Sequence, residues 1–254
     1  YDGSMKYVRL LAADSVRYGI LESEMIRLID SSPFDAFQLT DETVPFNEAR
    51  LLAPTPFSKA ICIGLNYRDH AEELGLPIPT DPVVFLKPST TIVGPKEAIV
   101  KPAMCTRLDY EAELAVVIGK RARFVSVEEA QSYILGYSCA NDVTARDLQP
   151  KTGQWTVAKG FDTFCPYGPF ISDEVDPSNL NVESRVNGER KQSSNTRHLI
   201  FSVPVLVSYL SRVMTLLPGD IILTGTPGGI GPMERGDTVE VIIEGLGTLQ
   251  NPII

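Results

Sequence analysis

The chain has few of the residues that mark disulfide-rich, zinc-binding and nucleic-acid-binding proteins. It contains 4 cysteines, none in C-x-x-C spacing, and only 2 histidines among 254 residues. Basic residues are also outnumbered, because 23 Lys and Arg against 32 Asp and Glu give a net charge of -9. Disulfide frameworks and zinc knuckles need closely spaced cysteines, and phosphate binding needs a cationic face. We therefore expect a protein with reduced cysteines, no zinc knuckle and no nucleic-acid partner.

Long apolar runs are missing as well. No stretch approaches the ~18 consecutive apolar residues of a membrane span. The first residues also lack the basic-then-apolar pattern of a signal peptide. We expect a cytoplasmic protein with no membrane partner, and we interpret residues 1–4, which precede Met5, as an expression scar.

The rest of the composition is that of a globular protein, with 43% hydrophobic and 22% charged residues. Short apolar pieces between polar turns in residues 5–55 predict a small β-rich N-terminal domain. Pro54 and Pro56 discourage helix, so the chain is expected to be extended where this domain ends. We place the larger domain at residues 56–254.

Strand signals outnumber helix signals in the larger domain. Helices are expected at residues 66–75, 127–133 and 203–213. Regular alternation of strand and helix is absent, which argues against a doubly wound parallel sheet. The sequence thus predicts an α+β fold that is predominantly β. The expected strands are 60–63, 83–86, 114–118, 168–171, 221–224 and 238–243.

The glycine-rich stretch 225–231 invites a nucleotide-binding interpretation. A phosphate loop needs a lysine or the start of a helix directly after its glycines. Here the glycines lead into Met233 and a further strand. We predict a loop between strands, in which glycine permits positive φ or close backbone approach.

Acidic residues alternate just before the strand expected at 114–118. Asp109, Glu111 and Glu113 would share one face of a continuous strand. Partly buried like charges at this spacing repel each other unless a cation or protons compensate. With so few histidines the ligands would be oxygens, which favours Mg²⁺, Mn²⁺ or Ca²⁺ over zinc. The alternative is a solvated edge strand whose acids prevent aggregation.

Polar groups also concentrate in residues 139–149, where another strand is expected to end. Asp142, Arg146 and Gln149 lie in this segment, and a common position for site residues is the end of a strand. The alternative is an ordinary polar turn that contains an Asp–Arg pair.

Three further residues have side chains suited to catalysis. His70 and Glu73 are three positions apart on an expected helix, so the carboxylate can orient the imidazole for proton transfer. A surface contact or a mobile lid would give the same pattern. Lys87 and Lys159 follow apolar or aromatic residues, where a lysine is costly unless it is paired. Either can bind a substrate carboxylate or an enolate, or can simply be solvated.

Five segments in series resemble the fumarylacetoacetate hydrolase family. Their order and spacing also match, over roughly residues 56–250, and the N-terminal module resembles the small domain that many bacterial members carry. The resemblance implies a mixed β-sandwich roll and a homodimer. The segments are GLNYRDH at 64–70, FLKPS at 85–89, DYEAEL at 109–114, NDVTARD at 141–147 and ILTGTP at 222–227.

The resemblance also assigns roles. It implies that Mg²⁺ or Mn²⁺ is held by Glu111, Glu113 and Asp142, while Asp109 only supports them. It implies an acid–base pair on a lid and a set of contacts to the oxo-acid end of the substrate. The acid–base pair is His70 and Glu73, and the substrate contacts are Lys159, Arg146, Gln149 and Thr226.

Members of the family act on 2-oxo acids and 1,3-dicarbonyl compounds. They hydrolyse acylpyruvates, decarboxylate oxaloacetate, or isomerise and decarboxylate dienoic diacids. Because His70 and Glu73 are both present, the leading hypothesis is a metal-dependent C–C bond hydrolase acting on acylpyruvates. The alternatives are oxaloacetate decarboxylase, dienedioate isomerase and a catalytically silent dimer that binds a metabolite.

Overall fold

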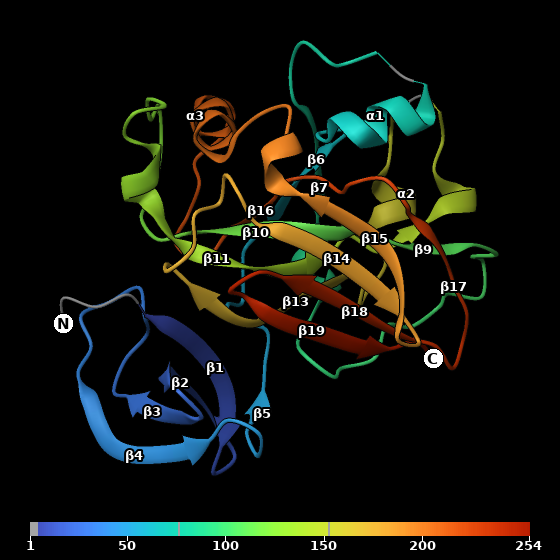
Figure 1. Cartoon of the computed structure of the whole chain (residues 1–254). Helices are drawn as coiled ribbons and strands as arrows, with labels where there is room; N and C mark the ends of the chain where they lie inside the picture. Colours follow the sequence, from blue (N-terminus) through green and yellow to red (C-terminus); the bar gives the residue numbers. More distant parts are fainter. Residues whose placement is uncertain (1–4, 76, 152) are drawn as a thin grey trace.

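The computed structural model describes residues 5–75, 77–151 and 153–254, and most of its regular structure is β-strand (Figure 1). The strands form sheets of 12, 3 and 4 members. Only three α-helices occur in the described residues: α1 (Arg68–Leu74), α2 (Thr156–Lys159) and α3 (Val203–Val213). None of these described helices is long and apolar enough to cross a membrane. The predicted α+β fold, predominantly β, is confirmed.

The largest sheet runs through the whole molecule. Most of its neighbours are antiparallel, whereas β16–β6 and β13–β8 are parallel. In addition to the main path, β5 (Arg50–Leu51) pairs with β1 and β8 (Ile92–Val93) pairs with β13. The main order is β4 (Leu39–Pro45), β3 (Met25–Ile29), β2 (Ser15–Glu22), β1 (Lys6–Ala12), β13 (Cys165–Ser172), β11 (Ile134–Asn141), β10 (Ala112–Ile118), β16 (Ile221–Leu223), β6 (Ala60–Gly64) and β7 (Val83–Lys87).

Two smaller sheets complete the β structure. The four-stranded sheet packs over β10 and β11, as Figure 1 shows, and encloses an apolar core. Leu114 and Val116 of β10 lie in this core with Val182 and Val241, and α3 closes it with Leu206. The four strands are β15 (Glu189–Asn195), β14 (Asn181–Val186), β18 (Thr238–Ile243) and β19 (Gly247–Pro252). The three-stranded sheet consists of β12 (Thr144–Ala145), β9 (Leu108–Tyr110) and β17 (Gly231–Met233).

The helix predictions have mixed outcomes. The prediction at 203–213 is confirmed by α3, and the one at 66–75 by α1, which ends at Gly75 with φ of 62°. The α-helix predicted at 127–133 is wrong, because only the 3-10 turn Ala130–Tyr133 forms. Glu129 does accept a hydrogen bond from the Ser126 hydroxyl (2.9 Å), as a capping residue would. The chain then enters β11 at once, which leaves too few residues for an α-helix.

The continuous strand expected from Asp109 onward is interrupted at Glu111. Strand β9 ends at Tyr110 and belongs to the three-stranded sheet, while β10 begins at Ala112 in the large sheet. Glu111 therefore lies where the chain crosses between sheets. Its N–H donates to Asn141 Oδ1 (2.9 Å), and its carbonyl accepts from the N–H of Asp142 (2.9 Å).

The N-terminal strands share the large sheet with the rest of the chain. Residues Lys6 and Tyr7 of β1 pair with Ser172 and Ile171 of β13. The division into domains 5–55 and 56–254 stays a prediction. The interpretation of residues 1–4 as an expression scar lies outside the described residues.

Asn66 connects its own segment to those of Thr224 and Phe201, so its removal tests the local architecture. Its amide donates to the carbonyls of Thr224 (2.7 Å) and Phe201 (3.1 Å) and accepts from Phe201 N–H (2.8 Å). Because Asn66 is fully buried and its loss leaves the Thr224 and Phe201 backbone groups without these bonds, Asn66→Ala should lower the free energy of unfolding by about 1–3 kcal/mol, measured by urea denaturation. Asn47→Ala, at an exposed site, should change it by less than about 0.5 kcal/mol. Equal effects of the two substitutions would contradict this assignment.

Candidate active site

Three buried carboxylates converge where β9, β10 and β11 meet. One oxygen from each of Glu111, Glu113 and Asp142 lies within 4.8 Å of the others. Glu113 is the second residue of β10 and pairs with Ala140 of β11, and Asp142 directly follows β11. The crossing of the chain at Glu111 delivers the third group. The residues are only 6%, 1% and 1% exposed, respectively, so solvent does little to screen their repulsion.

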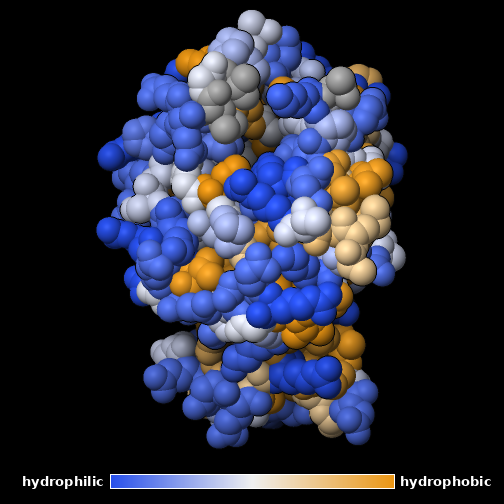
Figure 2. All heavy atoms as spheres, turned by 90° about the vertical axis from the view of Figure 1, so that its right-hand side faces the viewer, coloured by the Kyte–Doolittle hydropathy of each residue, from blue (hydrophilic) through white to orange (hydrophobic). Residues whose placement is uncertain are grey.

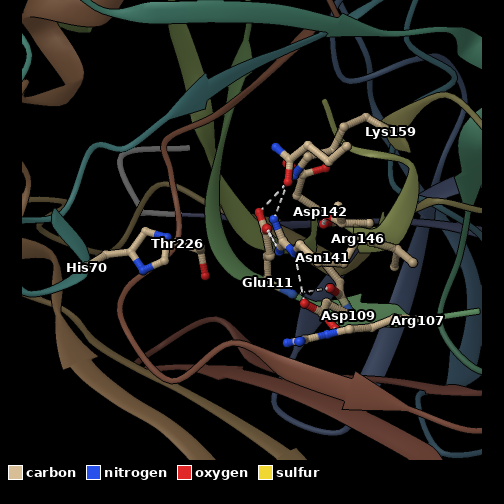
Figure 3. Close-up of polar contacts among 12 residues, drawn as sticks. His70, Arg107, Asp109, Glu111, Asn141, Asp142, Arg146, Lys159 and Thr226 are labelled. Carbon is tan, nitrogen blue, oxygen red and sulfur yellow. Dashed lines mark hydrogen bonds and ion pairs between the residues drawn. The ribbon is translucent and has the colours of Figure 1, made fainter. Parts of the chain in front are cut away.

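Fixed cations neutralise part of this negative charge. Lys159 Nζ lies 2.9 Å from Glu111 Oε2 and 2.6 Å from Asp142 Oδ2. Arg146 forms ion pairs with Glu111 and with Asp109 Oδ2, the latter at 2.8 Å. Figure 3 shows these groups as one connected chain of contacts. Asp109 thus holds an arginine that in turn holds Glu111, in agreement with the supporting position expected for it.

The carboxylates differ in their affinity for protons. Burial raises the pKa of Glu111, but Lys159 and Arg146 outweigh it and lower the value to about 2. Burial also raises the pKa of Glu113, and the neighbouring Asp142 and Glu111 raise it further. Within the described residues, no ion pair to Glu113 occurs, and its carboxylate instead accepts the N–H of Gly225 (2.8 Å). Glu113 is therefore the group whose charge most needs a further cation.

This arrangement fits a divalent metal ion. Three carboxylates supply the oxygen ligands that Mg²⁺ and Mn²⁺ prefer, within reach of a single ion. An ion would also remove the unfavourable charge at Glu113. The predicted ligand set is brought together, and it supports a divalent metal site.

His70 lies on the opposite side of the same cavity from these carboxylates. Its Nδ1 is 3.2 Å from Glu73 Oε2, so the predicted pair is formed. Glu73 also accepts the N–H of Gly229, which ties α1 to the glycine loop. A second tie comes from Ser194, whose hydroxyl donates to Asp69 (2.6 Å). Whether α1 acts as a lid stays a prediction.

The cavity between His70 and the carboxylates has a volume of about 180 Å³ and is lined by most of the predicted site residues. Figure 3 shows Thr226 on the side of His70, across from Glu111. Glu73 does not line the cavity and reaches it only through the imidazole. The predicted residues along its wall are His70, Glu111, Glu113, Asp142, Arg146, Gln149, Lys159 and Thr226.

Lys87 is positioned differently from the substrate contact predicted for it. It is fully buried and absent from the cavity wall. Its ammonium donates to the carbonyls of Val143 (3.0 Å) and Phe164 (2.6 Å) and lies 2.7 Å from Asp142 Oδ1. The two carbonyls accept hydrogen bonds from the ammonium, and its contact with Asp142 is an ion pair. Lys87 is the last residue of β7, and its side chain points into the protein toward Asp142. It therefore supports a carboxylate and does not face the cavity.

Several residues that shape the site carry no catalytic signal in the sequence. Gln192 donates to the Thr226 hydroxyl oxygen (2.8 Å), which leaves the hydroxyl proton free to point into the cavity. Phe85 and Trp155 pack edge to face, 5.2 Å between centroids, and line the same cavity. Gly225 has φ of 103°, and a Cβ there would lie 2.8 Å from Asn66 Cβ. Only the glycine was anticipated, as a position of positive φ or close approach.

Metal binding can be tested through thermal stability. Adding Mn²⁺ should raise the melting temperature, because an ion that binds only the folded chain stabilises it by about 2.7 kcal/mol at 100 times its Kd. Glu113→Gln should abolish most of this rise, whereas Glu128→Gln, at an exposed position outside the cluster, should preserve it. The rise should shrink as the pH falls, since the raised pKa of Glu113 makes protons compete with the ion. A rise that persists in Glu113→Gln would count against the site.

Comparison with known proteins gives matches over nearly the whole chain. Residues 59–254 match the family model described as fumarylacetoacetate (FAA) hydrolase C-terminal, and residues 5–54 match the model described as Rv2993c-like, N-terminal. A solved structure described as 2-hydroxyhepta-2,4-diene-1,7-dioate isomerase from Mycobacterium marinum is 46% identical. It aligns over 98% of each chain with a TM-score of 0.92.

Two further relatives differ in their described activities. The mitochondrial oxaloacetate tautomerase Fahd2a of Rattus norvegicus is 42% identical over 83% of this chain and 71% of its own length. The structure of fumarylpyruvate hydrolase from Pseudomonas aeruginosa, in complex with Mn²⁺ and pyruvate, is 33% identical. It covers 85% of this chain and 92% of its own, with a TM-score of 0.74.

Proposed function

The chain belongs to the fumarylacetoacetate hydrolase family, and we propose that it is a divalent-metal-dependent hydrolase that cleaves a C–C bond in acylpyruvates and related 1,3-diketo acids. The observation that carries this proposal is the His70–Glu73 pair, 3.2 Å apart, across a small cavity from the buried carboxylates. A cavity of about 180 Å³ is below the roughly 300–1,000 Å³ usual for drug-sized ligands. That size favours a compact acid such as acetylpyruvate over a long dienedioate.

We assign Glu111, Glu113 and Asp142 to hold Mg²⁺ or Mn²⁺, and Ca²⁺ would suit the same oxygen ligands. When bound, the ion supplies Lewis acidity to the 2-oxo and carboxylate oxygens of the substrate. The manganese and pyruvate in the related fumarylpyruvate hydrolase support this assignment.

Arg146, Gln149 and Thr226 are proposed to orient the oxo-acid end of the substrate. All three line the cavity, and Gln192 leaves the Thr226 hydroxyl proton available for donation. Lys159 is proposed to stabilise negative charge that develops on the 2-oxo oxygen. Burial lowers its pKa, but Asp142 and Glu111 raise it to a net value above normal, so the ammonium keeps its proton.

His70 is proposed to move the protons. A proton on Nδ1, donated to Glu73, leaves Nε2 free to accept one from water. The water oxygen then forms a bond to the distal carbonyl carbon, and the C–C bond breaks with its electron pair remaining on the pyruvate fragment. Protonated His70 returns its proton to the methylene carbon of that fragment. The products are a carboxylic acid and pyruvate, and atoms balance without a further reactant.

A second candidate is tautomerisation of a 2-oxo diacid, favoured by the names of the rat and mycobacterial relatives. It needs the same enolate and proton carrier but no attack by water. The small cavity would also admit oxaloacetate. Decarboxylation of oxaloacetate and a silent metabolite-binding dimer remain as further alternatives. The homodimer expected from the family and the cytoplasmic location expected from the sequence remain part of the proposal.

The reaction can be identified by following acetylpyruvate hydrolysis and the enol-to-keto conversion of oxaloacetate, each with Mg²⁺ and with EDTA. We expect metal-dependent hydrolysis of acetylpyruvate to acetate and pyruvate. Tautomerisation of oxaloacetate without any hydrolysis would instead select the second candidate. Activity on either substrate that survives EDTA, or no activity on both, would reject both candidates.

The role of His70 can be tested with the other histidine of the chain as a matched control. His70→Ala should lower kcat for hydrolysis by about 10²–10⁴-fold, the usual contribution of a general acid–base. His198→Ala, which removes a partly exposed imidazole outside the cavity, should leave kcat unchanged. Glu73→Gln should reduce kcat less than His70→Ala, since it weakens only the orientation of the ring. A His70→Ala enzyme with normal kcat would exclude this mechanism.

A further inference from the structure

A second and larger cavity lies away from the carboxylates, where the N-terminal strands meet the rest of the molecule. We call it the junction cavity, and its walls are residues 46, 47, 49–51 and 95–97 together with Pro169 and Phe170 of β13 and residues 247, 248 and 250 of β19. Its volume is about 560 Å³, within the roughly 300–1,000 Å³ of small-molecule sites. It shares no lining residue with the catalytic cavity. Figure 2 shows hydrophobic surface at the level where the N-terminal strands meet the larger body.

The junction cavity offers an aromatic surface drawn from both parts of the chain. Phe46 precedes β5, and Phe170 lies on β13, with ring centroids 6.5 Å apart and planes inclined at 63°. Leu51 adds a partly exposed aliphatic group beside them. An apolar ring or chain placed here would be removed from water at little steric cost.

Two cations border this apolar surface without partners. Arg50 and Lys96 are both exposed, and neither side chain has an ion pair or hydrogen bond within the described residues. The one acid in the wall, Glu97, already accepts the N–H of Gly94. In a chain with a net charge of -9, two unpaired cations beside an apolar cavity are complementary to an anion.

The backbone at Lys96 forms part of a tight turn, in which Glu97 N–H donates to the carbonyl of Gly94 (3.3 Å). The φ of Lys96 is 66°, in the left-handed region that glycine and asparagine adopt readily and lysine adopts rarely. The conformation is held by the Lys96 N–H, which donates to the carbonyl of Gln250 (2.7 Å) on β19. A turn with proline at its second position commonly has positive φ at its third, so the turn accounts for this conformation.

We propose that the junction cavity binds a small amphipathic organic anion, with an apolar ring or chain against Phe46 and Phe170 and its anionic group at Arg50 and Lys96. The site is independent of the catalytic cavity, so its ligand does not compete with the substrate.

The test is a fluorescence titration of the full chain, with Mg²⁺ present, using anilinonaphthalene sulfonate as an apolar anionic probe. We expect saturable binding at one site per chain. Decanoate should displace the probe, whereas decanol, which has no charge, should displace it poorly. Oxalate, which is small and lacks an apolar body, should not displace it.

Four variants locate the binding. Arg50→Gln with Lys96→Gln should weaken it by at least about tenfold, the effect of losing one strong charged contact. Thr248→Trp, at an exposed position in the wall, should block it by filling the cavity. Lys96→Asn should weaken binding while the melting temperature stays the same or rises, since asparagine fits the left-handed backbone. The matched control, Lys120→Gln with Arg190→Gln, removes two exposed cations elsewhere and should bind normally.

Two results would overturn the proposal. One is probe binding that neither the Arg50 and Lys96 substitutions nor Thr248→Trp changes. The other is a sedimentation experiment in which Thr248→Trp dissociates an oligomer that does not bind the probe, because the cavity would then be covered by a second copy of this chain.

Discussion

The burial of three carboxylates within 4.8 Å of one another is the constraint on which the rest of the site depends. Solvent is excluded, so each negative charge must be neutralised by a neighbouring cation or hydrogen-bond donor. Lys159 and Arg146 form ion pairs with Glu111, and Lys87 and Lys159 form ion pairs with Asp142. Strand β7 and helix α2 each end by delivering one of these lysines. Among the described residues, the only hydrogen-bond donor to the Glu113 carboxylate is the N–H of Gly225, so Glu113 is the carboxylate that most lacks a neighbouring positive charge.

The opposite wall of the catalytic cavity follows a different design. His70 contacts Glu73, whose side chain is itself 45% exposed. Both residues lie on the short helix α1, which forms hydrogen bonds with Ser194 and Gly229. One wall therefore holds charged groups at the ends of β10 and β11, while the other carries His70, the proposed proton carrier, on a short helix. The proposed reaction needs both walls, because it combines charge stabilisation at fixed positions with proton transfer.

Features that depend on residues close together in the sequence were predictable from the sequence. The strands, α3 and the pairing of His70 with Glu73 depend on short-range periodicity, and the five family segments identified the carboxylates that converge. The direction of Lys87 was not predictable, because it depends on acceptors supplied by Val143 and Phe164, more than fifty residues later in the chain. The contact of Gln192 with Thr226 is equally remote in sequence. The break at Glu111 arises from a change of sheet, which no local pattern records.

The pairing of β1 with β13 also has a consequence for how the chain avoids association. Strand β13 is buried along its whole length, and β1 pairs with the end that contains Ile171 and Ser172. A chain without its first strands would present the apolar end of β13 with unpaired backbone groups, which is a template for pairing with another molecule. The N-terminal strands thus extend the sheet outward until it ends at β4, whose central residues Asp41 and Glu42 are exposed and charged. The sheet therefore ends in a charged edge strand, which disfavours pairing with another copy of the chain, instead of in an apolar one.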